Sequence, residues 1–182
     1  MSPGILLRPK SCLARALSRI RILLVALAAM AAVAALGFSD SLCTGRVLTA
    51  AQVQALFPNK TFVDSDHYAV VNSDCLQVLQ DIFISALYRN GLKPEWSPRF
   101  ACGKFSLVYL STARLTYLSH HVHDANLPPL ALGEVWYMTG PKSAHAIVVA
   151  ITERGVVYWD PQCGQEVTMS ADLLAGTMMR KF

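Results

Sequence analysis

The chain has 182 residues, of which 53% are hydrophobic, so it is long enough to bury one core and is expected to form one folded domain. Its formal charge of +4 does not indicate nucleic-acid binding, because five basic residues and no acidic residue fall within positions 1–21. Removing those five leaves 11 Lys and Arg against 12 Asp and Glu, so residues 22–182 carry a formal charge of −1. Nucleic acid is therefore not an expected partner.

An apolar run follows this basic segment. Residues 22–38 contain no charged residue and are rich in Leu and Ala, which is typical of a secretory signal or an N-terminal signal anchor. The length lies between a signal-peptide core and a full membrane span, so cleavage is left open. We expect a leader over 1–40 and an exported domain over 41–182. That domain is either anchored in the inner membrane facing the periplasm, or secreted if the leader is cleaved.

Two helices are predicted in the first half of the domain. The Thr49–Gln52 capping box begins a short helix that ends near Phe57. The Asp74–Gln77 segment has the same spacing and begins a second helix, which Asn90-Gly91 ends. The apolar face of the second helix is formed by Leu76, Leu79, Phe83 and Leu87.

A third helix is predicted over 102–118. Its apolar anchors are expected to be Phe105, Val108, Leu115 and Leu118. Cys102 is its first residue, a position where the helix dipole and free N–H groups favour a thiolate. Gly103 beside it lets another chain or a substrate approach the sulfur closely.

The second half of the domain predicts β-structure. Short β-branched or aromatic runs are expected to be strands at 134–138, 145–152 and 156–159. Tight turns, among them Glu153-Arg154-Gly155, join them as antiparallel neighbours, and Ser170 caps a last short helix. Helices followed by a meander of strands predict an α+β fold.

Three polar residues occur in the order that a thiol nucleophile needs. Cys102 supplies the sulfur, His145 begins a central strand and Asp160 ends the next strand. A base must reach the thiol, and a carboxylate must orient the base. The turn at 153–155 lies near the midpoint between His145 and Asp160, so the hairpin places the carboxylate near the imidazole. Gln162 is a further candidate, which either donates to an oxyanion or holds the imidazole.

Metal and disulfide chemistry are less expected. No Cys-x-x-Cys pair and no paired Cys/His spacing of the zinc type occurs, so no cofactor is predicted. The His-rich loop 120–124 is the alternative metal site, although loops of this kind are usually solvated. With Cys102 kept as a free nucleophile, the three other cysteines after the leader allow at most one disulfide, and these are Cys43, Cys75 and Cys163.

Several of these motifs resemble those of the papain-like cysteine hydrolases. The segment Phe100–Phe105 is similar to the nucleophile motif of NlpC-type cell-wall peptidases, and Gly133–Tyr137 to the strand before their histidine strand. Two other segments, Ser143–Ala146 and Trp159–Gln162, resemble more closely the papain-like domain that ends certain fungal agglutinins and has bacterial and phage relatives. The segment Glu95–Phe100 also resembles the residues that precede the cysteine in that group.

The resemblance covers roughly residues 74–168 and implies N-terminal helices, including the nucleophile helix, packed on a small antiparallel sheet. It implies Cys102 as nucleophile, His145 as base and Asp160 as orienter. With the leader, it predicts an exported thiol hydrolase, a cysteine protease or amidase that cleaves peptidoglycan stem peptides or envelope proteins. Ala101 and Gly103-Lys104 differ from the acidic or small polar residues of these relatives. Two alternatives therefore stand: an inactive module that binds peptide or glycan, and a membrane-anchored interaction or exclusion protein.

Overall fold

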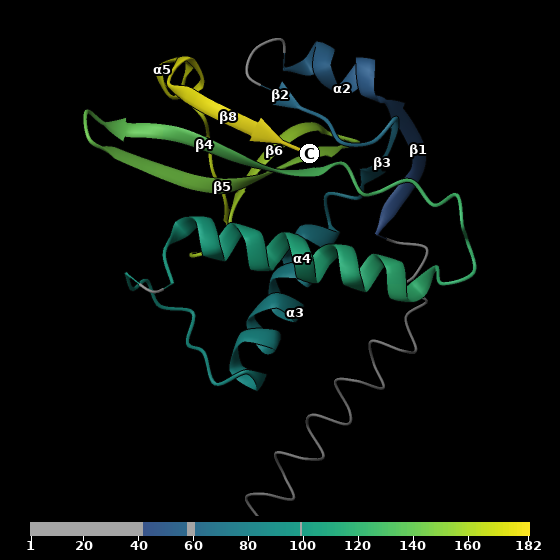
Figure 1. The fold of residues 1–182 in the computed structure, drawn as a ribbon, viewed down its shortest axis with the longest axis horizontal. Coiled ribbons are helices and arrows are strands. Elements are labelled where there is room, and N and C mark those ends of the chain that lie inside the picture. The colour runs from purple at the N-terminus through teal and green to yellow at the C-terminus, as the bar shows by residue number, and fades with distance from the viewer. Residues whose placement is uncertain (1–41, 58–60, 99) are drawn as a thin grey trace, which may run out of the picture. The chain divides into compact units, whose positions relative to one another are not determined.

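A sheet of eight strands runs through the part of the chain that the computed structural model describes, which is residues 42–57, 61–98 and 100–182. The strands are β1 (Cys43–Thr49), β2 (Thr61–Phe62), β3 (His67–Val71), β4 (Leu132–Gly140), β5 (Ser143–Thr152), β6 (Gly155–Asp160), β7 (Gln165–Glu166) and β8 (Thr177–Lys181). Their order is β1-β3-β5-β4-β8-β2, while β6 pairs with β5 and β7 with β6. The helices of these residues are α2 (Ala50–Leu56), α3 (Cys75–Arg89), α4 (Cys102–His120) and α5 (Ala171–Ala175). Figure 1 shows α3 and α4 on one side of the sheet, with α2 and α5 on the other.

This architecture corrects the predicted fold class. The sequence predicts an α+β, papain-like arrangement in which N-terminal helices pack on a small antiparallel sheet. The observed sheet is large and mixed, because β2 pairs with β8 and β3 with β5 in parallel. Three strands also precede the two long helices. Sequence patterning misses two of these strands because β1 buries only Leu48 and β2 has two residues, so neither shows a clear alternation of apolar and polar positions. Strand β3 is a short buried run, and its partner β5 is distant in the sequence.

Strand β5 is the centre of the sheet. Every residue from Ala146 to Thr152 is buried, as expected of a strand with both faces covered. On one face, Ile147, Val149 and Ile151 belong to a core that includes Phe182. Strands β4 and β6 both pair with β5 in antiparallel fashion, so the predicted series of hairpins is confirmed.

Aromatic rings hold α3 against α4 on the other face. The Phe83 ring lies 6.3 Å from that of Phe105 and 5.8 Å from that of Tyr109, both in edge-to-face arrangements. The Tyr109 hydroxyl donates to the carbonyl of Leu76 at 2.9 Å. These contacts fix the start of α4 relative to α3, and the predicted apolar face of α3 is confirmed.

The buried face of α4 differs from the predicted one. Leu115 and Leu118 are 67% and 53% exposed, so the prediction that they anchor the helix is wrong. Phe105 is buried as predicted, and the other buried residues of the helix are Ser106, Tyr109, Leu110, Ala113 and Tyr117. Three of these six are aromatic and bury more area than a leucine, which explains why the helix buries this face.

Side chains cap two of the helices as predicted. Thr49 and Gln52 form a complete capping box at α2, and the Ser170 hydroxyl accepts from the Leu173 N–H at α5. The prediction for α3 is wrong, since Asp74 makes no side-chain capping bond. The segment before α3 is held instead by Glu153 of the β5–β6 turn. Its carboxylate accepts from the Ser73 N–H at 2.9 Å and from the Ser73 hydroxyl.

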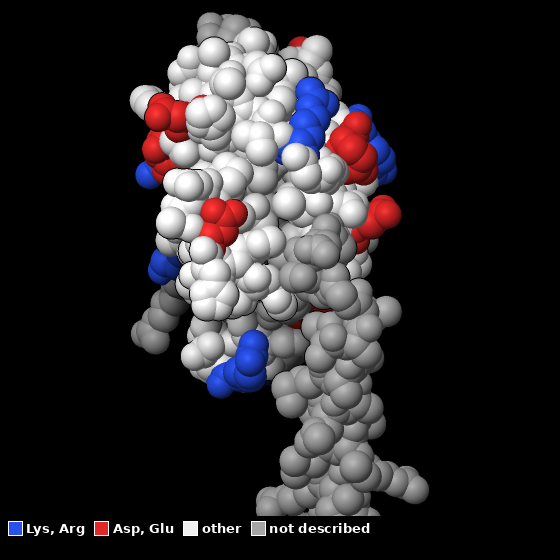
Figure 2. Space-filling model, turned by 90° about the vertical axis from the view of Figure 1, so that its right-hand side faces the viewer, with Lys and Arg blue, Asp and Glu red and all other residues white. Residues whose placement is uncertain are grey.

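The predicted leader over 1–40, with its apolar run 22–38, lies outside the described residues, and export stays a prediction. Within the described residues, no helix has both the length and the apolar character needed to cross a membrane. On the face drawn in Figure 2, the basic and acidic side chains of these residues are interspersed rather than gathered by sign. A surface of that kind generates no strong long-range field of one sign.

The Glu153–Ser73 contact makes stability depend on pH. The Ser73 hydroxyl is the main cause that holds the pKa of Glu153 below its usual value. A lowered carboxyl pKa stabilises the fold above the unfolded-state value of about 4.3, and the contribution is lost as the pH falls through the folded-state value.

We therefore predict that Glu153→Gln lowers the free energy of unfolding at pH 7 by about 1 kcal/mol, since the carboxylate is partly exposed. The deficit should shrink towards zero near pH 3 in urea titrations. Glu166→Gln is the matched control, because Glu166 makes only an exposed 3.5 Å contact with Arg154. Equal losses from both variants, or a Glu153→Gln loss that does not vary with pH, would contradict this account.

Candidate functional site

Helix α4 begins at Cys102, whose side chain is a thiol. The preceding Ala101 has extended backbone angles and makes no side-chain capping bond. Its carbonyl accepts from the N–H groups of Lys104 and Phe105 at 2.9 and 3.1 Å. The N–H groups of Cys102 and Gly103, the first two helical residues, lie before the first of these bonds and have no partner within an α-helix. With the helix dipole, they favour a negative charge or a ligand oxygen at this position.

His145 and Asp160 meet where the β5–β6 hairpin ends. The hairpin pairs Val148 with Trp159, which brings the start of β5 beside the end of β6. The His145 Nε2 atom lies 2.9 Å from Oδ2 of Asp160. The two side chains are 23% and 15% exposed, so the pair is mostly enclosed but open to solvent on one side.

A second hydrogen bond fixes the Asp160 carboxylate. The backbone N–H of Gln162 donates to Oδ1 of Asp160 at 2.9 Å, which is the pattern of an Asx turn. That bond leaves Oδ2 directed at His145. The Gln162 side chain is expected from the sequence to reach an oxyanion or the imidazole, whereas the contact observed for this residue comes from its backbone and goes to the carboxylate.

Cys102 lies close enough to His145 to affect the pKa of its imidazole. The bond to Asp160 is the main cause that raises the pKa of His145; burial opposes it, and Cys102 adds to it. The structure thus brings together three of the predicted site residues, one each from α4, β5 and β6. A proton on the imidazole is favoured there, which suits a group that exchanges a proton with a thiol.

Tyr137 encloses the imidazole from the next strand. It lies opposite His145 in the β4–β5 pairing, and the two rings meet edge to face with centroids 5.8 Å apart. Burial is the main cause that raises the pKa of Tyr137, with the charges of Asp160 and Cys102 in the same direction. The Tyr137 hydroxyl therefore stays neutral beside the site.

Trp136 packs directly on the start of α4. A Cβ atom on Gly103 would lie 2.6 Å from Cζ2 and 2.8 Å from Cη2 of the Trp136 indole. Only glycine allows the helix and the ring to approach this closely. The sequence predicts that Gly103 admits another chain or a substrate, and in the structure the group that approaches it is this indole.

One residue of the site region is missed by the sequence predictions. Gln80 of α3 is 4% exposed and hydrogen-bonds the residues on both sides of Asp160, namely Trp159 and Pro161. A signal for it exists in the sequence. An amide at this position interrupts the apolar face of α3, and a buried amide requires partners.

Neither a disulfide nor a metal-binding cluster is found among the cysteines and histidines that the structure describes. Of the described cysteines besides Cys102, Cys75 is buried, Cys43 lies 3.9 Å from the Tyr117 hydroxyl and Cys163 is exposed, and none of them forms a disulfide. Over the described ranges, no three His, Cys, Asp or Glu side chains lie close enough to hold a metal ion.

Two solved structures share this fold. One is described as the PSL1a–E64 complex and aligns with a TM-score of 0.60 and 18% identity, over 75% of this chain and 50% of that chain. The other is Polyporus squamosus lectin bound to the human-type influenza-binding epitope Neu5Acα2-6Galβ1-4GlcNAc, with a TM-score of 0.57 and 19% identity, over 75% of this chain and 49% of that chain. This chain thus spans about half the length of the chains that it matches. No protein-family model and no curated protein matches the sequence.

These comparisons correct the family prediction. The sequence motifs predict a papain-like cysteine hydrolase, and that prediction is wrong: no model of such a family matches, and the named protein among the matching structures is a lectin. The predicted keywords of hydrolase and thiol protease are corrected with it. At 18% and 19% identity, the likeness concerns the fold. Short motifs misled because they occupy few positions, whereas a fold match covers three quarters of the chain.

We predict that Gly103→Ala destabilises the domain by about 1–3 kcal/mol, because the new methyl group overlaps the Trp136 indole. Chemical denaturation of the full-length protein measures the loss. In the double variant with Trp136→Leu, the added cost of the alanine should fall to near zero, since the overlapping ring atoms are gone. An alanine that costs the same with and without the indole would contradict the proposed packing.

Proposed function

We propose that this domain is a binding module for a glycan or a peptide, with its ligand site at the N-terminal end of α4. The observation that carries the proposal is the convergence of Cys102, His145 and Asp160 from three separate elements in a half-buried setting. Ligand sites typically combine a few convergent polar groups with apolar walls, here the rings of Trp136 and Tyr137. The fold shared with Polyporus squamosus lectin supports the glycan class.

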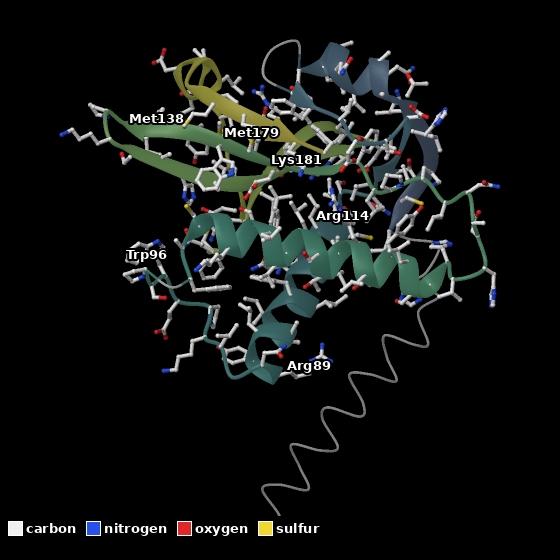
Figure 3. All side chains as sticks on the ribbon, viewed as in Figure 1. Arg89, Trp96, Arg114, Met138, Met179 and Lys181 are labelled. Carbon is white, nitrogen blue, oxygen red and sulfur yellow. The ribbon has the colours of Figure 1, made fainter. Side chains whose placement is uncertain are left out.

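An exposed tryptophan extends the proposed site. Trp96 is 63% exposed and lies on the loop before α4, at the end of that helix where Cys102 stands (Figure 3). Two backbone bonds between Ser97 and Phe100, of 3.1 and 2.9 Å, close the turn that follows it. These bonds hold the backbone of Ser97, the residue next to Trp96. A flat apolar ring with one N–H donor suits stacking on a sugar ring or on a peptide side chain.

We predict that the full-length protein binds the trisaccharide Neu5Acα2-6Galβ1-4GlcNAc, measured by isothermal titration calorimetry. Trp96→Ala should weaken binding at least about tenfold, which corresponds to about 1.4 kcal/mol. Tyr88→Ala is the matched control, because Tyr88 is 61% exposed and lies at the far end of α3. No binding of this trisaccharide or of a glycan panel at about 1 mM, or equal effects from Trp96→Ala and Tyr88→Ala, would contradict the glycan proposal.

A second candidate function is favoured by the thiol itself. We propose that Cys102 is a reactive nucleophile of this site, because it lies beside an imidazole that Asp160 orients. One of the structures that share the fold is described as a complex with E64, a compound that carries an epoxide. With such a compound, the sulfur would form a bond to one epoxide carbon. The C–O bond would break, and the oxygen would take a proton from His145.

We predict that E64 adds once to the full-length protein, with a mass increase equal to the whole reagent in intact mass spectrometry. Cys102→Ala should abolish the addition, and His145→Ala should slow it by about 100-fold. Cys163→Ala is the control, since Cys163 is a free thiol with greater exposure. Addition that persists in Cys102→Ala, or no addition to the wild type, would contradict a nucleophilic role and leave the binding proposal to the calorimetry.

A further inference from the structure

We propose that Gln80 of α3 is a positioning residue for Asp160, and through it for His145. Gln80 would control the geometry of the proposed site without contacting a ligand, so this role rests on the proposed function. Its basis is a buried amide whose two ends bind the residues on either side of the carboxylate.

Both ends of the Gln80 amide are used. Its Nε2 donates to the carbonyl of Pro161 at 2.9 Å, and its Oε1 accepts from the Trp159 indole N–H at 3.0 Å. All three groups are buried away from water, so without these bonds their polar atoms would lack a partner. Asp160 stands between these two partners, so one side chain binds the backbone just after it and the indole of the residue just before it.

The turn that follows Asp160 is shaped around the same amide. Gly164 has a φ of +65°, and its N–H donates to the Asp160 carbonyl at 2.8 Å. A Cβ at Gly164 would meet Gln80 Cγ at 3.1 Å and Nε2 at 3.2 Å. The glycine therefore serves both the left-handed backbone and the space for the glutamine.

Gln80 is connected to His145 through Asp160. With its backbone fixed by Gln80 and Gly164, the Asp160 carboxylate has one oxygen on the Gln162 N–H and the other on His145 at 2.9 Å. If Trp159 and Pro161 lose the amide, the carboxylate gains freedom that weakens its bond to the imidazole. A residue that only packed α3 against β6 would leave that bond unchanged.

The test is an NMR titration of the His145 ring in full-length protein, under conditions where every variant is folded. Gln80→Met keeps the length of the side chain and removes both hydrogen bonds. We expect the pKa of His145 to fall, since the bond to Asp160 is the main cause that raises it. Gln77→Met is the matched control, because Gln77 lies on the same helix, is exposed and bonds only Asp81 at 3.2 Å.

Two further variants keep the test decisive. Asp160→Asn removes the carboxylate itself and so gives the largest fall in the His145 pKa that its loss can cause. Gly164→Ala displaces Gln80 from the other side, so it serves if Gln80→Met does not fold. The inference is overturned if Asp160→Asn lowers the midpoint while Gln80→Met and Gly164→Ala leave it at the wild-type value. It is equally overturned if Gln77→Met lowers it as much as Gln80→Met. Trisaccharide and E64 binding do not enter this readout, so failure of the proposed function is seen separately.

Discussion

The hydrogen bond between His145 and Asp160 is the interaction on which the rest of the site depends. It joins His145, the third residue of β5, to Asp160, the last residue of β6, at 2.9 Å, and it holds the imidazole beside Cys102. Both partners are mostly enclosed, so the bond is stronger than a surface ion pair, and neither group is fully removed from water. Loss of this bond would leave the Cys102 side chain beside an imidazole of undefined orientation.

Much of the surrounding structure holds these two residues in place. Tyr137 covers one side of the imidazole, and Gln80 and Gly164 hold the turn after Asp160. The Trp136 indole packs on Gly103 and so fixes the start of α4. Each support comes from a different element, which places the site where α3, α4 and the hairpin meet. A site built on rigid elements in this way keeps its geometry without a ligand, as binding modules with preformed sites do.

The sequence predicts the local structure that carries the site better than it predicts the whole fold. The start of α4 at Cys102, the β5–β6 hairpin and the nearness of His145 to Asp160 follow from helix signals and from a turn near the midpoint of two strands. These are interactions between neighbours in the chain. Strands β1 to β3 are not predicted. Strand β1 is mostly exposed and β2 has two residues, while β3 is mostly buried but pairs with β1 and with the distant β5.

Errors elsewhere have equally physical causes. Leu115 and Leu118 fit a helical period, but aromatic residues on another stripe of α4 bury more area and decide its rotation. Asp74 has the spacing of a cap, yet Glu153 from a distant turn binds the preceding Ser73. The role of Gln80 depends on two tertiary hydrogen bonds that no local pattern specifies. The family prediction rested on short motifs, and the comparisons overturn it in favour of a fold shared with a lectin.

The most direct test of the account is a double-mutant cycle of unfolding free energies with His145→Phe and Asp160→Asn, carried out at pH 5.5 and pH 9. Because the pKa of His145 is raised, the contribution of the pair is present at low pH and is lost as the pH rises through that pKa. The account predicts a coupling free energy of about 1–2 kcal/mol at pH 5.5 that is clearly smaller at pH 9. A coupling near zero at pH 5.5, or one that does not change with pH, would contradict it.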